Sequence, residues 1–434
     1  MNKIIILTVF LILFQFCAHS QTTITKWKDD KKGAVSITFD DGNRNQFKYA
    51  LPILERLQLP ATFYIITGPI IGSQYPGKFI GRNVNDIIKE TATIPTDSTN
   101  YFERASAAKY LNRIGADAYY DKSAIAFEDG KIDKAYKIMD TLYQKARDGS
   151  FKTGIEYSDE VAQEMGLSWD SIKVYASKGY EFASHTVTHT HLAVLDTANI
   201  NYELYKSKDD IKNHLGSAYT FDAEIPFGIE HPRALKYGFP AYAALRNMMT
   251  DSFLFEINRG YKTQPGSSNK AYVQWQRGPL SKTTLAQMKS YIDTTLAHNN
   301  IWLVLVFHGI NGLGWEALPD TMLETYFQYI KQNENNLWIT TFKDAGKYMR
   351  ERMHTNIKEF ENNTVISVQL TQTIDKNVYD VPLTLKTYVP ANWKYVIATQ
   401  ANFKQRLKPI EDKKGHYVLY DATPAAGEIK LSAH

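Results

Sequence analysis

Residues 34–66 read AVSITFDDGNRNQFKYALPILERLQLPATFYII, and this stretch decides the fold class. Residues 34–39 and 61–66 are mostly apolar, β-branched or aromatic, as short buried strands are. Between them, apolar side chains recur at the spacing of a helix over residues 47–57. A strand, a helix and a strand at this spacing predict a βαβ unit, and such a unit requires a parallel sheet.

The alternation of strands and helices continues towards the C-terminus. The clearest further strand is IWLVLVF at residues 301–307, which is apolar throughout, as a strand covered on both faces is. The other predicted strands occupy residues 180–184, 223–226, 252–257, 272–276 and 337–340. The predicted helices occupy residues 169–178, 200–215, 241–248, 285–298, 321–333 and 342–353. Together these elements predict an α/β domain over residues 21–355.

Two parts of the chain depart from this alternation. Residues 72–160 are polar and mostly helical in pattern, which indicates a helical insertion in the α/β domain. Residues 356–434 contain β-rich segments that no long helix separates, and they predict a small antiparallel, sandwich-like β-domain. We interpret the β-domain as a structural cap or spacer, with a carbohydrate-binding role as the alternative.

The N-terminus has the pattern of an export signal over residues 1–20. Lys3 supplies a positive charge, residues 4–16 form an apolar run, and small residues precede a predicted cleavage site before Gln21. The run has thirteen residues, whereas a membrane span needs about twenty. We therefore expect a periplasmic or extracellular protein whose mature chain has no stable membrane span. A retained anchor or a lipid on Cys17 is the alternative.

Composition narrows the chemistry that the chain can carry. Cys17 is the only cysteine among 434 residues, so the exported mature chain would have no disulfide and no thiolate metal site. Any bound metal would therefore need His, Asp or Glu ligands. The formal net charge of +4 is close to balance and gives no indication of a nucleic-acid partner.

Two carboxylates follow the first predicted strand directly. Asp40 and Asp41 precede the flexible Gly42, and in a parallel α/β fold the carboxyl ends of the strands form the rim where ligands bind. Adjacent carboxylates repel each other unless a cation or a shared proton compensates them. The alternative is that Asp41 or Asn43 caps the following helix.

Histidines follow two other predicted strands. His185 and His189 are four residues apart after the strand at 180–184, so both can face one side of a helical turn and bind one metal together with an anionic ligand. The alternative is that they are surface or core residues, and the nearby His191 weakens the spacing argument. His308 closes the strand at 301–307. Three polar strand ends at the same rim together predict a shared site that could bind a metal.

Two motifs now carry a resemblance to a known family. TFDDG at residues 38–42 and SHTVTH at residues 184–189 resemble the first two motifs of the NodB-homology polysaccharide deacetylases, carbohydrate esterase family four. The segments 169–185, 305–308 and 337–349 are similar to further segments of that family. The resemblance covers about residues 33–353 apart from the insertion, and it implies a distorted (β/α) barrel.

The resemblance also implies a function and residues to perform it. Members of the family hydrolyse N- or O-linked acetyl groups on polysaccharides or oligosaccharides. They use a divalent metal, commonly zinc and sometimes cobalt or nickel. By the motifs, Asp41, His185 and His189 would bind the metal. Asp40 would be the general base that activates a water, and His308 would protonate the leaving group. The implied partner is an acetylated glycan.

The resemblance extends to the walls of the substrate site. A backbone N–H near Phe227 would help to hold the oxyanion, and Val306 would lie against the acetyl methyl group. Trp275 and Trp315 are candidates for sugar-stacking walls, with the hydrophobic core as the alternative for each.

The chain departs from the family pattern in two places. The third motif normally reads Arg-x-Pro-Tyr, but residues 223–228 read AEIPFG, with Glu224 in place of the arginine that orients the base. We expect Arg277 to supply that positive charge to Asp40 from a neighbouring strand end. The aspartate of the fourth motif has no obvious counterpart, and Gln274 or Gln276 is predicted near its place.

These departures keep two other functions open. One is a catalytically weakened protein that binds glycans through the same site. The other is a metal-dependent amidase that acts on a small non-sugar substrate, because this kind of barrel accepts new chemistry through its loops.

Overall fold

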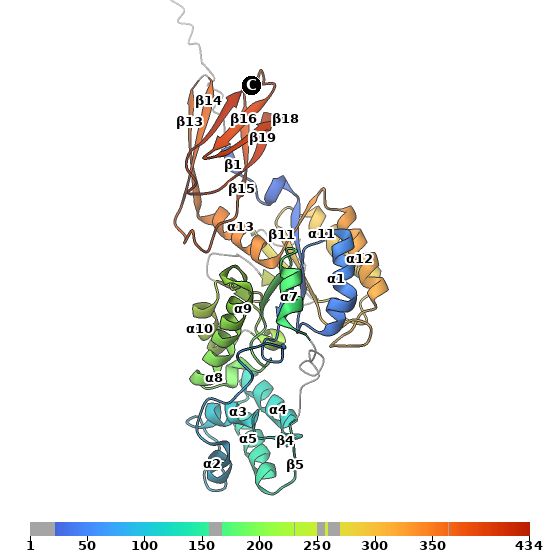
Figure 1. Cartoon of the computed structure of the whole chain (residues 1–434), viewed down its shortest axis with the longest axis vertical. Helices are drawn as coiled ribbons and strands as arrows, with labels where there is room; N and C mark the ends of the chain where they lie inside the picture. Colours follow the sequence, from blue (N-terminus) through green and yellow to red (C-terminus); the bar gives the residue numbers. More distant parts are fainter. Residues whose placement is uncertain (1–21, 156–166, 230, 250–256, 259–269, 363) are drawn as a thin grey trace, which may run out of the picture. The chain divides into compact units, whose positions relative to one another are not determined.

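A computed structural model describes residues 22–434 except 156–166, 230, 250–256, 259–269 and 363 (Figure 1). The described chain forms two compact units. The larger unit contains residues 26–353 and 374–381, and the smaller one contains residues 22–25, 354–373 and 382–434. The predicted export signal lies outside the described residues. Among those described, no helix is both long and apolar enough to cross a membrane.

A parallel sheet forms the centre of the larger unit. The middle strand β2 (Gly33–Phe39) is buried at every residue, because the sheet is covered on both faces. One edge of β2 pairs with β11 (Ile301–Phe307), and the other pairs first with β12 (Leu337–Ile339) and then with β3 (Thr62–Ile65). The remaining strands are β6 (Glu181–Ser184), β7 (Asp222–Ala223) and β8 (Ala244–Leu245) beyond β3, and β10 (Val273–Arg277) and β9 (Ile257–Asn258) beyond β11. The open, all-parallel order confirms the predicted distorted (β/α) barrel.

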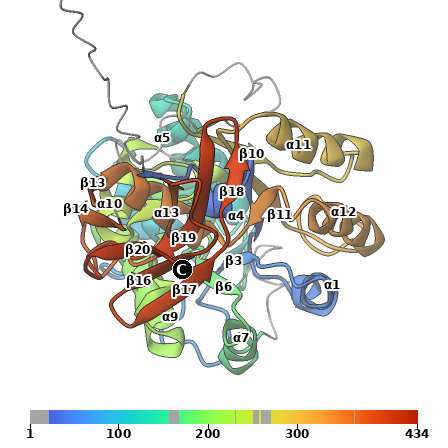
Figure 2. The same ribbon diagram turned by 90° about the horizontal axis from the view of Figure 1, so that it is seen from above.

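Helices cover the outside of the sheet. Figure 2 shows α1, α7, α11 and α12 around strands β3, β6, β10 and β11. Two of these helices begin with a capping box, in which Thr284 with Gln287 and Ser168 with Ser171 satisfy the free N–H groups of the first turn. The bounds are α1 (Leu51–Leu57), α7 (Trp169–Ala176), α11 (Leu285–Ala297) and α12 (Asp320–Gln332), and the other helices of the barrel are α8 (Thr197–Asn201), α9 (Ser207–Leu215), α10 (Pro232–Ala241) and α13 (Phe342–His354).

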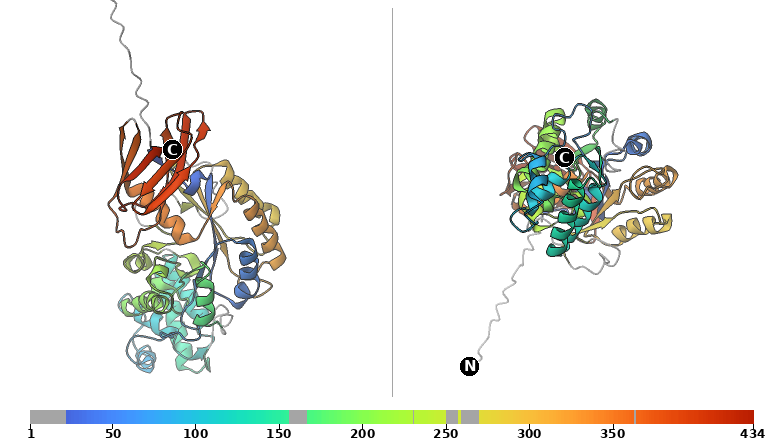
Figure 3. Two further views of the ribbon diagram at one scale, coloured as in Figure 1. Left: turned by 45° about the horizontal axis from the view of Figure 1, so that its top comes forward. Right: turned by 90° about the horizontal axis from the view of Figure 1, so that it is seen from below.

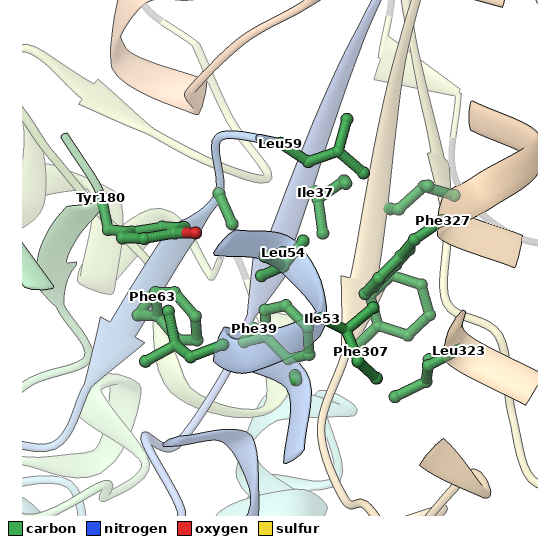
Figure 4. Close-up of a cluster of buried hydrophobic side chains, with 14 of the residues drawn as sticks. Ile37, Phe39, Ile53, Leu54, Leu59, Phe63, Tyr180, Phe307, Leu323 and Phe327 are labelled. Atoms are coloured by element: carbon green, nitrogen blue, oxygen red, sulfur yellow. The ribbon is translucent and has the colours of Figure 1, made fainter. Parts of the chain in front are cut away.

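Aromatic rings fill the space between sheet and helices (Figure 4). Phe39 stacks on Phe63 with ring centroids 5.0 Å apart and on Phe307 with centroids 5.4 Å apart. All three rings are buried, and each comes from a different strand. Because Phe39 precedes Asp40 and Phe307 precedes His308, this stack fixes the strand ends that carry the candidate site.

The predicted helical insertion is confirmed as a helical bundle with its own core. Its buried Arg104 donates hydrogen bonds to Thr96 Oγ1 (2.9 Å) and to the carbonyl oxygen of Ile94 (3.0 Å), so the charged side chain is satisfied inside the bundle. The helices of the bundle are α2 (Val84–Glu90), α3 (Tyr101–Ala108), α4 (Asp117–Glu128) and α5 (Ile132–Arg147).

The smaller unit consists of two antiparallel sheets, which confirms the predicted β-domain (Figure 3). Apolar residues alternate along β14, so one face of its sheet is buried and the other is not. One sheet has the order β1 (Thr22–Ile24), β15 (Leu383–Val389), β19 (Gly415–Ala422) and β18 (Ile410–Asp412). The other has the order β13 (Thr355–Asn362), β14 (Val365–Gln372), β20 (Ile429–Ala433), β16 (Val396–Gln400) and β17 (Phe403–Leu407). The N-terminal strand β1 therefore belongs to this unit, which the boundary predicted after residue 355 did not include.

One predicted element of the barrel is wrong. Residues 241–248 were expected to form a helix, but α10 ends at Ala241 and the chain turns into β8. Tyr242 already has extended backbone angles (φ −131°, ψ 144°). A strand of two residues is too short to show the alternation of polar and apolar side chains. The apolar residues of this segment also have the spacing of a helix, which is why the sequence predicts a helix here. The strand expected at 252–257 lies outside the described residues except for Ile257, which begins β9.

Candidate active site

The carboxyl ends of the parallel strands surround a cavity of about 550 Å³. Side chains that follow five different strands of the sheet meet there, as ligand sites at this end of a parallel sheet do. The residues that line it include Asp40, Asp41, His185, His189, Glu224, Phe227, Arg246, Asn247, Gln276, Arg277, Val306, His308 and Trp315. The cavity therefore brings together most of the site residues that the sequence predicts.

Asp41, His185 and His189 form a cluster that suits a metal ion. Asp41 Oδ1 lies 3.6 Å from His185 Nε2 and 3.5 Å from His189 Nε2, and one ligand atom of each residue lies within 4.8 Å of the others. All three side chains are buried. Two imidazole nitrogens and one carboxylate oxygen are the donor set of many catalytic zinc sites, so these residues fit a divalent cation.

Hydrogen bonds and charges prepare the cluster for a cation. His185 Nδ1 lies 3.0 Å from the carbonyl oxygen of Glu224, so Nδ1 carries the proton and Nε2 is left as a ligand. Burial and the neighbouring His185 lower the pKa of His189 to about 3, which keeps this imidazole neutral, as a metal ligand must be. Burial would raise the pKa of Asp41, but its hydrogen bond to His185 and the charges of the histidines outweigh burial and lower it.

Left-handed backbone conformations gather at the site. Asp41 (φ 72°), Thr186 (φ 67°), His189 (φ 54°) and Phe227 (φ 63°) all lie in the region that glycine favours. Such residues cost roughly 1–3 kcal/mol each and persist only where their surroundings hold them. The stretch from His185 to His189 is thus a strained turn, and the helical turn expected for it is wrong.

A buried carboxylate holds this strained turn in place. Glu203 Oε2 accepts hydrogen bonds from the backbone N–H groups of Val187 and Thr188, both at 2.9 Å, and Oε1 accepts one from the Thr188 hydroxyl at 2.8 Å. Burial raises the pKa of Glu203, and these hydrogen bonds oppose that rise. Glu203 was not singled out by the sequence, because it lies fourteen positions after His189 in a helical segment with no motif.

Replacing Glu203 by Leu should destabilise the protein through this turn. Three donors lose their acceptor inside the protein, so we expect the free energy of unfolding to fall by about 3 kcal/mol. Glu203→Gln keeps one acceptor oxygen and should lose about 1 kcal/mol. Urea unfolding of metal-free protein measures both. Equal stability of the Leu variant and the wild type would contradict a role for Glu203 in holding the turn.

The positive charge beside Asp40 comes from Arg246. Its Nη1 donates a hydrogen bond to Asp40 Oδ1, and its Nη2 lies 2.6 Å from Asp40 Oδ2. Burial would raise the pKa of Asp40, but the charges of Arg246 and His308 outweigh burial and lower it. The prediction that Arg277 supplies this charge is therefore corrected. Arg277 lies over the ring of Trp275, 4.3 Å from its centroid, and donates a hydrogen bond to the carbonyl oxygen of Gln276.

Arg246 is itself fixed from several sides. Its Nη2 lies 3.1 Å from Glu224 Oε1. Glu224, which stands where the family motif has arginine, therefore helps to hold Arg246 beside Asp40. The side-chain amides of Gln274 (2.7 Å) and Gln276 (3.0 Å) both donate hydrogen bonds to the carbonyl oxygen of Arg246. These two glutamines, expected near the place of the fourth-motif aspartate, thus support the base through Arg246.

Matched substitutions of the two arginines test this assignment. Arg246 and Arg277 are each only 3% exposed, so lysine costs a similar amount of packing at either position. Arg246→Lys keeps the charge but loses the two-point contact with Asp40, and loss of one charge-assisted hydrogen bond should lower kcat by about 10- to 100-fold. Arg277→Lys should leave kcat within about threefold, because no charge-assisted contact with the base is lost. A larger loss of kcat at position 277 than at 246 would restore the original prediction.

His308 lies next to Asp40 at the end of β11. Its Nε2 is 3.4 Å from Asp40 Oδ2. Gln46 joins the two strand ends, because its amide donates hydrogen bonds to the carbonyl oxygens of both Asp40 and His308. Asn43 Oδ1 accepts hydrogen bonds from the backbone N–H groups of Asn45 and Gln46. The capping role considered for Asp41 or Asn43 therefore belongs to Asn43.

Part of the chain matches a known protein family. Residues 28–97 and 119–238 match the polysaccharide deacetylase family. The matched ranges contain Asp40 and the three candidate metal ligands Asp41, His185 and His189. Over these ranges the chain has a polysaccharide deacetylase domain. The gap between the two ranges lies within the helical insertion, and Arg246 and His308 follow the matched ranges.

The chain is also similar to individual proteins. It is 23% identical over 323 residues to a gellan lyase of a Bacillus species, and the match spans 65% of this chain but only 12% of that relative. Several crystal structures match at low identity. Three of them are the family-four esterase domain of a multidomain xylanase from the hindgut metagenome of Trinervitermes trinervoides (13% identity, 72% of this chain and 89% of that one, TM-score 0.33), a putative polysaccharide deacetylase of Mycobacterium smegmatis (10%, 76% and 93%, 0.36) and an allantoinase (11%, 75% and 92%, 0.36).

The walls of the deacetylase cavity agree with the sequence in part. Phe227 and Trp315 line the cavity and are 47% and 53% exposed, and Val306 of β11 also lines it. The Trp315 ring meets the His308 ring edge-on, with centroids 4.7 Å apart. Trp275 is 2% exposed and packs against Tyr291 in the core, so its prediction as a sugar wall is wrong. Its side of β10 faces the helices, which the alternation of a fully buried strand does not reveal.

Proposed function

We propose that this chain is an exported, metal-dependent hydrolase that removes N- or O-linked acetyl groups from a polysaccharide or oligosaccharide. The observation that supports it is the convergence of Asp41, His185 and His189 beside Asp40 and His308 in one cavity. Export follows from the pattern of residues 1–20 and places the enzyme where extracellular glycans occur.

In this proposal, Asp41, His185 and His189 hold a divalent cation, with zinc as the first choice and cobalt or nickel as alternatives. When bound, the cation supplies Lewis-acid activation of a water and of the acyl carbonyl group. The three residues are spaced for such an ion, and the carbonyl oxygen of Glu224 fixes the ring of His185 towards it.

The acid–base chemistry belongs to Asp40 and His308. Asp40 is ionised because Arg246 lies beside it, so it can accept the proton of the attacking water. His308 then donates a proton to the departing amine or alkoxide. Since His308 Nε2 lies 3.4 Å from Asp40 Oδ2, a proton taken up by Asp40 is near the group that must deliver one.

The exposed rings of Phe227 and Trp315 suit the faces of a sugar. The Phe227 ring contacts the ring of His189, one of the candidate metal ligands, and the Trp315 ring contacts the ring of His308. A glycan unit would lie between these rings with its acetyl group towards Val306, and a backbone N–H near Phe227 would assist in holding the oxyanion.

Release of acetate from defined glycans tests the proposal. Purified protein loaded with zinc should release acetate from chitin oligosaccharides, from peptidoglycan fragments or from acetylated xylan oligosaccharides. A chelator should stop the release, and added zinc should restore it. If the protein binds one of these glycans without releasing acetate, it is a binding protein, and if it hydrolyses only small non-sugar amides, it is an amidase. The contact between Arg246 and Asp40 argues against the alternative of a catalytically weakened binding protein. The general base keeps a positively charged partner although Glu224 replaces the arginine of the motif.

A further inference from the structure

The ring of Phe227 occupies an unusual position. It is 47% exposed on the cavity wall, and its backbone lies in the left-handed region at φ 63°, directly before Gly228 at φ 62°. A bulky residue in this conformation needs its surroundings to hold it. The ring stacks on His191, with centroids 4.0 Å apart and planes 12° apart, and contacts His189 at a tilted angle. The His191 ring therefore supports the Phe227 ring, which forms part of the cavity wall.

The helical insertion determines how His191 lies. Its ring is buried, with Nδ1 at 3.0 Å and 3.2 Å from the two carboxylate oxygens of Glu128 on α4. The Glu128 side chain is only 6% exposed. Tyr120 of the same helix meets the His191 ring at an angle of 64°, and its hydroxyl lies 2.6 Å from Thr190 Oγ1. Helix α4 thus holds the two residues that follow His189.

We propose that Glu128 is a positioning residue for the substrate wall of this enzyme. Its carboxylate fixes the plane of the His191 imidazole, and that plane supports the ring of Phe227 over the cavity. The insertion then has a definite task, because it holds one wall of the site from outside the barrel. This inference rests on the proposed function only in taking Phe227 to border a sugar, and Glu128 itself touches neither substrate nor metal.

A fluorine label on the wall tests the support without any substrate. With 4-fluorophenylalanine at position 227, the zinc-loaded protein should give one sharp fluorine resonance. Glu128→Ala should broaden or split it, whereas Glu128→Gln, which still offers an oxygen to His191 Nδ1, should restore one resonance. Asp117→Ala, which removes the ion pair of α4 with Lys109, is the matched control and should leave the spectrum unchanged. An unchanged spectrum in Glu128→Ala overturns the proposal, and Glu128→Asp, which draws the carboxylate back by one methylene, serves if the Ala variant does not fold.

Kinetics then separates positioning from general damage. On an acetylated oligosaccharide that the wild type hydrolyses, Glu128→Ala should raise KM by about three- to tenfold and change kcat by less than about twofold, because an aromatic contact with substrate is lost rather than the acid–base groups. In a Phe227→Ala background the same substitution should add almost nothing to KM. A full additional rise there would show that Glu128 acts by another route. Absence of acetate release by the wild type would count against the proposed function alone, since the fluorine spectrum still decides the support of Phe227.

Discussion

Replacing Asp40 by Asn should lower kcat for acetate release by about 1000-fold, because asparagine cannot take the proton of the attacking water. The fold should survive this change. Arg246 keeps Glu224 as a partner at 3.1 Å, so no buried charge is left uncompensated. Steady-state kinetics, metal analysis and the midpoint of thermal unfolding on the same preparation measure the three expectations.

A second carboxylate of the cavity provides the control for Asp40. Glu224 also contacts Arg246, lines the same cavity and is as deeply buried, so Glu224→Gln tests whether any loss of negative charge near Arg246 is enough. We expect it to lower kcat by only about tenfold, since one charge-assisted hydrogen bond is weakened. If Glu224→Gln were as damaging as Asp40→Asn, the general base would have to be reassigned.

Replacing Asp41 by Asn should remove the metal and leave the fold intact. Asparagine tolerates the left-handed backbone at φ 72°, so the change affects the ligand charge rather than the turn. Loss of a residue that only hydrogen-bonds to a metal ligand typically lowers the metal affinity by about 10- to 100-fold. Loss of the negative charge of a ligand itself should therefore weaken zinc binding by more than about 100-fold. Acetate release should fall with it.

Thermal or urea unfolding with and without zinc reads this out independently of catalysis. For the wild type, free zinc at 100 times its Kd should raise the free energy of unfolding by about 2.7 kcal/mol. Asp41→Asn should lose this gain at the same zinc concentration, whereas Asp40→Asn should keep it. A wild type that zinc does not stabilise, or an Asp41→Asn protein that zinc stabilises equally, would remove the three-residue cluster as a metal site.

Much of the site was predictable because its residues follow strands that the sequence reveals. Asp40 and Asp41 follow a strand of seven buried residues, and His308 follows a strand of seven residues of which six are buried. His185 follows a strand of four residues that a helix with a clear capping pattern precedes. Once these strands are taken as parallel, their carboxyl ends must meet at one edge of the sheet, so the gathering of the polar residues is a consequence of topology.

The partner of Asp40 could not be predicted in the same way. Arg246 follows the two-residue strand β8, and neither alternation nor length marks so short a strand. The segment was therefore assigned to a helix, which removed Arg246 from the set of strand ends and left Arg277 as the nearest visible cation. Glu203 and Glu128 were missed for a different reason. Both act through contacts with residues that follow a strand end, and such contacts exist only after the chain has folded.

Strands β7 and β8 lie side by side with Ala223 opposite Leu245, so positions 224 and 246 occupy equivalent places on adjacent strands. Arg246 thus takes the place that the resembled motif gives to position 224, and Asp40 is its partner. A search that requires arginine at position 224 alone would therefore miss this positive charge, which lies one strand away.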